Sequence, residues 1–199
     1  ELGGLRPSAR GAAGAAPVAR MTALLSEVEG EPASWPAVAE RFPNRPTDDD
    51  NPDIPAAVTW RRLEAWIAWR WPARSVVWIV EGPGVFAPRL QPFTLAATEV
   101  WTDGAWRAVT LEAAPLGYAL EAGQYRLTGT AGDDADPPEA VLEAWKRLHE
   151  YGLGVARSWW TEAATYRTGE TQAPAGWAAK AIHLSGAADL LRPWRRLGA

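Results

Sequence analysis

The chain of 199 residues contains no cysteine, which excludes disulfides, a thiolate nucleophile and cysteine-ligated metal centres. It has two histidines, His149 and His183, and neither belongs to an HxxxH or HExxH pattern of the kind that binds zinc. No apolar run approaches the roughly 18 residues of a membrane-crossing helix, and the N-terminus lacks the apolar core of a secretory signal. We therefore expect a soluble protein, made in the cytosol, that needs no cofactor and contacts no membrane.

Positive charge is also scarce. The formal net charge is -4 and the pI is about 5.3, so the surface as a whole repels polyanions. A sequence-reading DNA-binding domain normally carries a basic face, so we do not expect one here. Apolar residues make up 47% of the chain and charged residues 22%, which is close to the globular average and indicates a folded domain.

Tryptophan is unusually abundant, with 13 residues. Large amphipathic rings are favoured where much contact area is buried, so most of them should lie in a core or an interface. A second interpretation is that Trp78, Trp101 and Trp106 form an exposed stacking platform for sugars. The chain would then be a carbohydrate-binding β module with a helical cap.

Residues 1–32 are expected to form a flexible N-terminal arm. The stretch 1–20 consists largely of Gly, Ala, Pro and Arg and has almost nothing to bury, so it is an arm or a stretch upstream of a start at Met21. A short helix is predicted over 34–41, with Ser34 as its N-cap.

A longer helix is predicted over 54–71, capped by Asp53 and ended by Pro72. Its polar residues Arg61, Arg62 and Glu64 are expected to face away from its apolar side. That apolar side recurs at helical spacing. It consists of Trp60, Leu63, Ile67 and Trp71.

The pattern then changes to short β-like runs over about 74–132, which predicts an inserted antiparallel sheet or pair of hairpins. The runs are SVVWIVE, FTLAATEVW, WRAVTLEA, YALEA and QYRLTGTA. Asp103-Gly104 separates two of them and is the strongest hairpin signal in the chain. The segment 81–86, EGPGVF, lacks the pattern of a phosphate-binding loop and is interpreted as a turn.

A second long helix is predicted to begin with Asp136 as N-cap, Pro137 at N1 and Glu139 at N3, and to continue to residue 165. One apolar stripe runs along it. The stripe consists of Val141, Trp145, Leu148, Gly152, Val155 and Trp159. The expected class is therefore α+β: a small helical bundle, core residues 33–165, with an inserted sheet and an extended C-terminal docking arm over 166–199.

No group of residues forms a recognisable catalytic or metal site. The acidic run Asp48, Asp49, Asp50 and Asp53 fails the EF-hand spacing, because Pro52 and Thr59 occupy ligand positions. We interpret it, like Asp133, Asp134 and Asp136, as solvated charge near a helix start. His149 lies near acidic residues but no nucleophile accompanies it, so we interpret it as a surface histidine and do not expect an enzyme.

The C-terminal tail contains the candidate binding residues. An apolar cluster lies among arginines at the end of the chain, and a short terminal helix cannot bury such a cluster against itself. Tryptophan and arginine are enriched at interface hot spots, which favours a partner protein as the receiver. Docking back onto the same subunit is the alternative. The candidate residues are Leu190, Leu191, Arg192, Pro193, Trp194, Arg195 and Arg196.

Taken in order, three stretches resemble the head-tail connector, or adaptor, family of long-tailed bacteriophages and gene transfer agents. The first is WRRLEAWIAWRW followed by RSVVWIVEG, a helix that ends in aromatic and Arg residues and leads into a β insertion. The second is EVWTDGAWRAVTL followed by GQYRLTGTAGDDADPPEAVLEAWKRLHEY, a hairpin, a strand and a helix that starts with Pro-Glu. The third is the ending SGAADLLRPWRRLGA. Together they span residues 33–199.

The resemblance implies a ring of copies, commonly twelve, beneath the portal protein at the head-tail junction of a virion or phage-like particle assembled in the host cytoplasm. The ring would extend the DNA channel and offer its other face to a stopper or other tail-completion protein. The C-terminal residues would grip the portal. Double-stranded DNA would pass through without being read, and an acidic lumen would favour sliding over binding.

Overall fold

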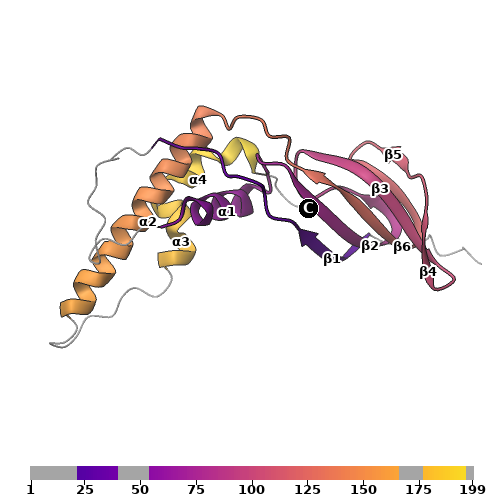
Figure 1. Cartoon of the computed structure of the whole chain (residues 1–199), viewed down its shortest axis with the longest axis horizontal. Coiled ribbons are helices and arrows are strands. Elements are labelled where there is room, and N and C mark those ends of the chain that lie inside the picture. Colours follow the sequence, from indigo (N-terminus) through magenta and orange to yellow (C-terminus); the bar gives the residue numbers. More distant parts are fainter. Residues whose placement is uncertain (1–21, 40–53, 166–176, 196–199) are drawn as a thin grey trace, which may run out of the picture.

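The computed structural model describes residues 22–39, 54–165 and 177–195, with the side chains of 156–165 and 177–179 left out. The chain is a mixed α+β protein, as predicted. Figure 1 shows an elongated molecule in which a helical lobe lies at one end and a curved antiparallel sheet at the other. Each lobe has an apolar cluster of its own.

The strands are β1 (Ala23–Glu29), β2 (Arg74–Phe86), β3 (Phe93–Thr102), β4 (Ala105–Ala108), β5 (Glu112–Ala114) and β6 (Gly117–Ala131). The helices are α1 (Ala56–Ile67), α2 (Glu139–Thr165), α3 (Trp177–Leu184), α4 (Ala187–Leu190) and the 3-10 turn η2 (Arg192–Trp194). The predicted insertion over about 74–132 therefore matches β2 to β6. Strand β1 is an addition from the predicted arm.

The sheet is antiparallel throughout, in the order β1-β2-β6-β3-β4, with β5 paired to β6. Alternate residues of β2 and β6 are buried, so one face of the sheet carries the core. Trp78 lies opposite Leu127 and is fully buried. Its ring contacts Phe86 and Phe93, at centroid distances of 5.5 and 4.6 Å. The burial of alternate residues is what an antiparallel sheet with one packed face requires.

Three strand predictions are wrong in the same region. The runs YALEA and QYRLTGTA form the single strand β6, whereas the run WRAVTLEA divides between β4 and β5. The segment EGPGVF lies inside β2 rather than in a turn. The register of β2 against β6 shifts between Gly82 and Gly84, so the ladder continues across the irregularity. A Cβ at Gly82 would lie 2.0 Å from the Glu121 carbonyl oxygen, so this close approach of two backbones requires glycine.

The predicted hairpin is confirmed. Strands β3 and β4 pair through Trp101 opposite Trp106 and are joined by Asp103 and Gly104. Both connecting residues have positive φ, 54° and 77°, as a tight two-residue hairpin requires. This hairpin lies at the end of the sheet farthest from the helical lobe (Figure 1).

The helical lobe packs α1, α2, α3 and α4 around a core rich in tryptophan. The ring of Trp60 lies 6.1 Å from that of Trp71 and 6.1 Å from that of Trp145. The apolar stripes predicted from the sequence supply this core. Its buried members include Trp60, Leu63, Ile67, Trp71, Val141, Trp145 and Leu148.

Helix starts and ends differ from the predictions. Helix α1 ends at Ile67 because Ala68 adopts a left-handed conformation, φ 57°, so Pro72 does not end it; the predicted cap Asp53 lies outside the described residues. Helix α2 begins at Glu139, two positions later than the predicted first helical residue, Pro137. The Pro138 carbonyl oxygen accepts from the Val141 and Leu142 amides, and Asp136 does not cap.

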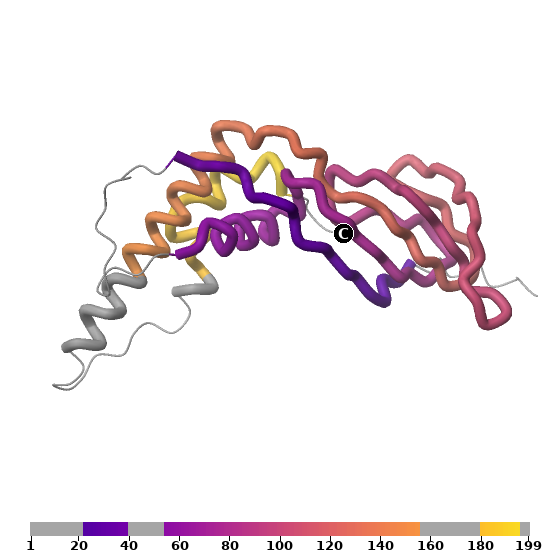
Figure 2. Tube along the Cα trace, viewed as in Figure 1, coloured from indigo at the N-terminus to yellow at the C-terminus, as the bar shows by residue number. Residues whose placement is uncertain are grey.

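The N-terminal predictions are corrected as well. Residues 34–39 are not helical, although Trp35 and Val38 pack against the helical core. Within 1–32, residues 23–29 form strand β1 because they pair with β2, so this stretch is not a loose arm. Residues 30–39 then run from the sheet along the helical lobe (Figure 2). Residues 1–21 lie outside the described part of the chain.

Candidate docking surface and lobe junction

The C-terminal segment folds against its own subunit. Ser185 separates α3 from α4; its hydroxyl donates to the Ile182 carbonyl and accepts from the Ala187 amide. Gly186 takes a positive φ of 75°, and the chain then turns back onto α2. The described residues 177–195 are therefore part of the helical lobe and not an extended arm. The predicted linker 166–176 lies outside the described residues.

This folding divides the predicted docking residues into two groups. Leu191 is fully buried in the helical core, so it belongs to the subunit itself, as in the alternative of docking back. Leu190 and Trp194 pack against that core but remain half-exposed, and Arg192 and Pro193 are exposed. The structure does not describe Arg196. A partner can therefore contact Leu190 and Trp194 but cannot reach Leu191.

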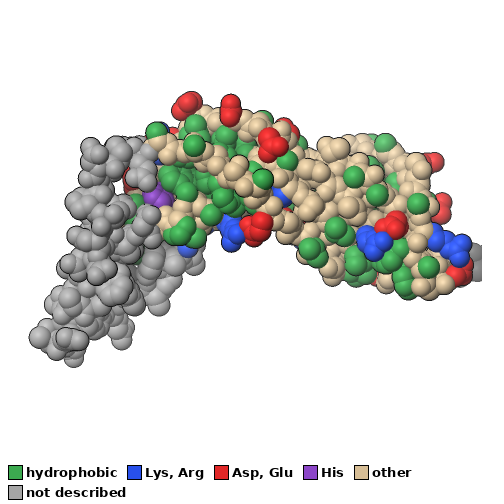
Figure 3. Space-filling model, viewed as in Figure 1, with side chains coloured by type: hydrophobic (Ala, Val, Ile, Leu, Met, Phe, Trp, Pro, Cys, Tyr) green, Lys and Arg blue, Asp and Glu red, His purple; other side chains and the backbone are tan. Residues whose placement is uncertain are grey.

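An aromatic and basic surface adjoins these residues. The Arg195 guanidinium carbon lies 4.4 Å from the centroid of the Trp66 ring, and the His183 ring meets the same indole edge-on at 4.7 Å. Arg195 and His183 are exposed, whereas Trp66 is half-buried. Neighbouring Leu184 exposes 58% of its surface. An anchored indole beside exposed arginine is the composition typical of protein interfaces. Figure 3 shows hydrophobic side chains gathered over this lobe.

A buried ion cluster joins the two lobes, and sequence analysis did not identify it. Arg74, at the start of β2, donates from Nη2 to Glu64 Oε1 of α1 at 3.1 Å and from Nη1 to Glu29 Oε1 of β1 at 3.1 Å. Arg70 donates to both oxygens of Glu29, at 2.6 and 2.9 Å, and to the Glu64 backbone carbonyl at 2.9 Å. The cluster thus connects a helix, an edge strand and the segment between the lobes.

The two carboxyl groups respond differently to this environment. Burial raises the pKa of Glu64 above its ordinary value, and this outweighs the lowering by the Arg74 and Arg70 charges. Burial also acts to raise the pKa of Glu29, but the hydrogen bond from Arg70 and the charges of Arg70 and Arg74 together lower it. Glu64 therefore takes up a proton at a higher pH than Glu29.

Spacing alone could have placed Glu64 in the core. It lies four residues after Trp60 and three before Ile67, which is the spacing of the apolar stripe of α1, so the expectation that it faces away is wrong. His149 follows the same rule, four residues after Trp145. It is buried, stacked on that indole at 4.5 Å, and its Nδ1 lies 3.1 Å from the Thr59 hydroxyl. The interpretation as a surface histidine is also wrong.

The remaining candidates from the sequence are the three tryptophans of the possible sugar platform and the two acidic groups. Trp78 is buried and cannot belong to a sugar-stacking platform, whereas Trp101 is 45% exposed and Trp106 is covered by Arg126 at 4.8 Å. The Asp48–Asp53 run lies outside the described residues. Asp134 accepts a hydrogen bond from the Ala73 amide at 2.8 Å, so it anchors the loop before α2.

Among the described residues, no three His, Asp or Glu side chains are grouped closely enough to hold a metal ion. None of the helices in that part of the chain is long and apolar enough to cross a membrane.

Comparison with known proteins gives one distant likeness. No protein-family model matches the sequence, and no curated protein matches it. A chain of a solved structure described as the neck of a native GTA particle, computed with C12 symmetry, aligns with a TM-score of 0.44 and 14% sequence identity. The alignment covers 72% of this chain and 81% of that chain.

Proposed function

We propose that this protein is a structural, non-catalytic adaptor at the head-tail junction of a tailed phage or gene transfer agent. Copies form a ring beneath the portal, twelve in the family that the sequence resembles, and the ring extends the DNA channel and presents a binding surface to a tail-completion protein. The observation that carries the proposal is the aromatic and basic surface of the C-terminal segment, which adjoins the ending SGAADLLRPWRRLGA of that resemblance.

The exposed part of the tail contacts the portal in this proposal. Trp194 is half-buried on its own core, which fixes its position before a partner arrives and reduces the entropy lost on binding. Arg195 is held on Trp66, and Pro193 is exposed in a 3-10 turn. The contact set is Leu190, Arg192, Pro193, Trp194, Arg195 and Arg196. Leu191 supports this set from the core beneath.

The experiment replaces two side chains at the surface of the helical lobe and keeps the fully buried residues. Truncation near residue 176 would also remove Ala181, Ile182 and Leu191 from the helical core, so loss of assembly could reflect unfolding. The double variant Trp194→Ala/Arg195→Ala avoids this. Its readout is the number of heads joined to tails, counted in electron micrographs of particles assembled in cells that carry the variant.

We expect joined particles to fall by about tenfold or more, which corresponds to about 1.4 kcal/mol of binding free energy. The matched control is Arg107→Ala/Val109→Ala, which removes an exposed arginine and an exposed apolar side chain near the opposite end of the molecule. An unchanged count for the tail variant, with normal thermal unfolding, contradicts the docking role.

A further inference from the structure

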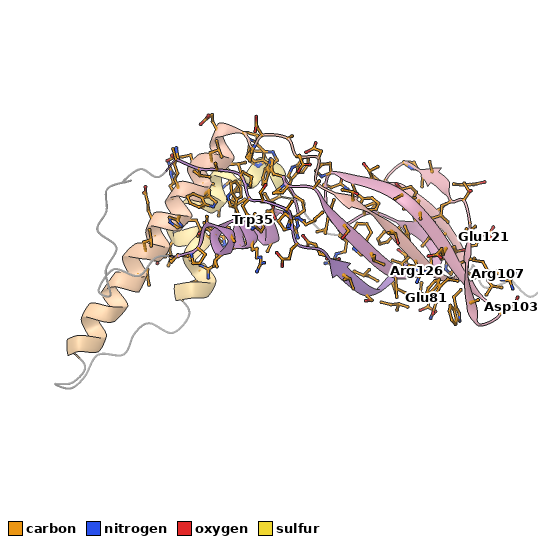
Figure 4. The ribbon with its side chains drawn as sticks, viewed as in Figure 1. Trp35, Glu81, Asp103, Arg107, Glu121 and Arg126 are labelled. Atoms are coloured by element: carbon orange, nitrogen blue, oxygen red, sulfur yellow. The ribbon has the colours of Figure 1, made fainter. Side chains whose placement is uncertain are left out.

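A groove of about 370 Å3 lies where three connecting segments cross between the lobes. One segment is residues 33–36 after β1, the second is Trp71-Pro72 before β2, and the third is residues 134–137 before α2. Its apolar walls are Trp35, Pro36, Trp71, Pro72 and Pro137. Figure 4 shows Trp35 beside α1, far from the charged residues labelled at the sheet end.

The walls of the groove are fixed by contacts within the subunit. The Asp134 amide donates to the Trp71 carbonyl at 2.9 Å, and the Asp134 carboxylate accepts from the Ala73 amide at 2.8 Å. The guanidinium carbon of Arg74 lies 5.0 Å from the centroid of the Trp35 ring, which holds that indole in place. The groove is therefore formed before any ligand binds, and a ligand need not pay the entropy of ordering it.

The rim of the groove is acidic. Asp133, Asp134 and Asp136 are exposed at its edge or next to it. Within the described ranges, no lysine or arginine forms an ion pair with Asp134 or Asp136. Walls of tryptophan and proline favour an extended segment that contains proline, and carboxylates at the rim favour arginine or lysine in it.

A segment outside the described residues has this chemistry over a long stretch. Residues 5–20, LRPSARGAAGAAPVAR, contain Arg6, Arg10 and Arg20, two prolines, small residues and no acidic residue. We propose that the groove of one copy binds residues 5–20 of a neighbouring copy. The net charge of this segment is opposite to that of the rim, and its small side chains fit between flat aromatic and proline walls.

The direction of β1 favours a neighbouring copy. Thr22 donates a hydrogen bond to the carbonyl oxygen of Val85, near the far end of β2, and β1 then runs toward the junction. Strand β1 therefore begins at the end of the sheet away from the groove of its own subunit (Figure 1). Exchange of this segment from copy to copy is a heterologous contact, which closes into a ring when the rotation fits.

This inference rests on the self-association in the proposed function but not on portal binding. Its test therefore uses the purified chain alone, with no portal present. If the peptide does not bind, the proposed docking to the portal still stands. If the particle count does not change, the proposed binding of residues 5–20 in the groove still stands. Both apolar clusters are built from residues 24–194, so a variant without residues 1–20 retains every described core residue.

The probe is a fluorescently labelled peptide of residues 5–20, titrated into the chain that lacks residues 1–20, with anisotropy as the readout. We expect saturable binding that weakens as salt rises, because charge pairs at an exposed rim are screened. Asp136→Arg should weaken binding about tenfold by reversing a rim charge. Asp134 is left unchanged because it also holds Ala73. Asp103→Arg makes the same charge change at the distant hairpin and should bind like the parent.

The full-length chain completes the test. Sedimentation should show association that increases with concentration, and removal of residues 1–20 should abolish it. Absence of peptide binding, or equal binding by Asp136→Arg and the parent, overturns the proposal. A full-length chain that stays monomeric at every concentration, while the peptide binds only the shortened chain, shows that the segment fills its own groove and overturns the assignment to a neighbour.

Discussion

Arg74 and Glu64 meet at 3.1 Å in the interior, with side chains that expose only 4% and 2% of their surface. Arg74 begins the sheet lobe and Glu64 belongs to the helical lobe, so this ion pair links the two. Burial of both charges is costly unless each compensates the other. Removal of one partner should therefore lower the stability of the folded protein far more than removal of both.

The first prediction compares removal of one partner of this ion pair with removal of both. Arg74→Met should lower the free energy of unfolding at pH 7 by about 3 kcal/mol, because it leaves the Glu64 carboxylate buried with less compensation. Adding Glu64→Gln should restore most of the loss. Urea unfolding followed by tryptophan fluorescence measures both. Arg61→Met is the control, because Arg61 pairs with Glu31 at the surface and should change stability by less than about 0.5 kcal/mol. Equal losses in the single and double variants contradict the prediction.

The second prediction concerns pH. Burial raises the pKa of Glu64 above 4.5, so between that pKa and 4.5 the folded state binds more protons than the unfolded state, and stability increases as pH falls. The pKa of Glu29 lies below 4.5, so stability decreases again as pH falls toward it. Glu64→Gln should remove the increase and keep the later decrease. Urea midpoints measured across this pH range check it, and identical profiles in parent and variant contradict it.

The third prediction separates the two leucines of the tail. Leu191→Ala should cost about 3 kcal/mol, because it opens a cavity in a fully packed core. Leu190→Ala should cost less than about 1.5 kcal/mol, since that side chain is half-exposed. Thermal and urea unfolding of both variants give the comparison. A similar cost at both positions indicates that the tail packs differently from the structure described.

The fourth prediction compares two glycines. Gly82→Ala should disrupt the sheet, because its Cβ would lie 2.0 Å from the Glu121 carbonyl oxygen. Gly154→Ala should raise stability by about 0.5 to 1 kcal/mol, because it lies inside α2 with nothing within 4 Å of the new Cβ and alanine favours helix. Thermal unfolding followed by circular dichroism should show a lower midpoint for Gly82→Ala and a higher midpoint for Gly154→Ala than for the parent. A destabilised Gly154→Ala variant would mean that α2 is interrupted at this position.

Periodic sequence patterns predicted the elements whose neighbours are local. The stripe of α2 and the Asp103-Gly104 hairpin depend on residues a few positions apart. The hairpin was correctly located, and so was the stripe from Val141 to Leu148; the side chain of Trp159 lies outside the described part of the chain. Strand β1 was missed because its short sequence gains stability only by pairing with β2, about fifty positions later. The joining of two expected runs into β6 likewise depends on the long partner strand.

The candidate surfaces were harder to predict than the fold. The composition of the tail indicated a binding region, but which leucine lies inward depends on the turn at Gly186 and on contacts with α2. The junction cluster brings together Glu29, Glu64, Arg70 and Arg74 from three elements, and no local pattern relates residue 29 to residue 74. Of these four residues, only Glu64 had a position in the sequence, on the apolar stripe of α1, that indicated burial.

The separation of the two apolar clusters has a mechanical consequence. A polar junction and three connecting segments link the lobes, and no apolar cluster of the described residues spans both. The position of the sheet relative to the helices therefore depends on ion pairs and connecting backbone. Conditions that weaken the ion cluster should loosen one lobe from the other while each apolar cluster stays packed.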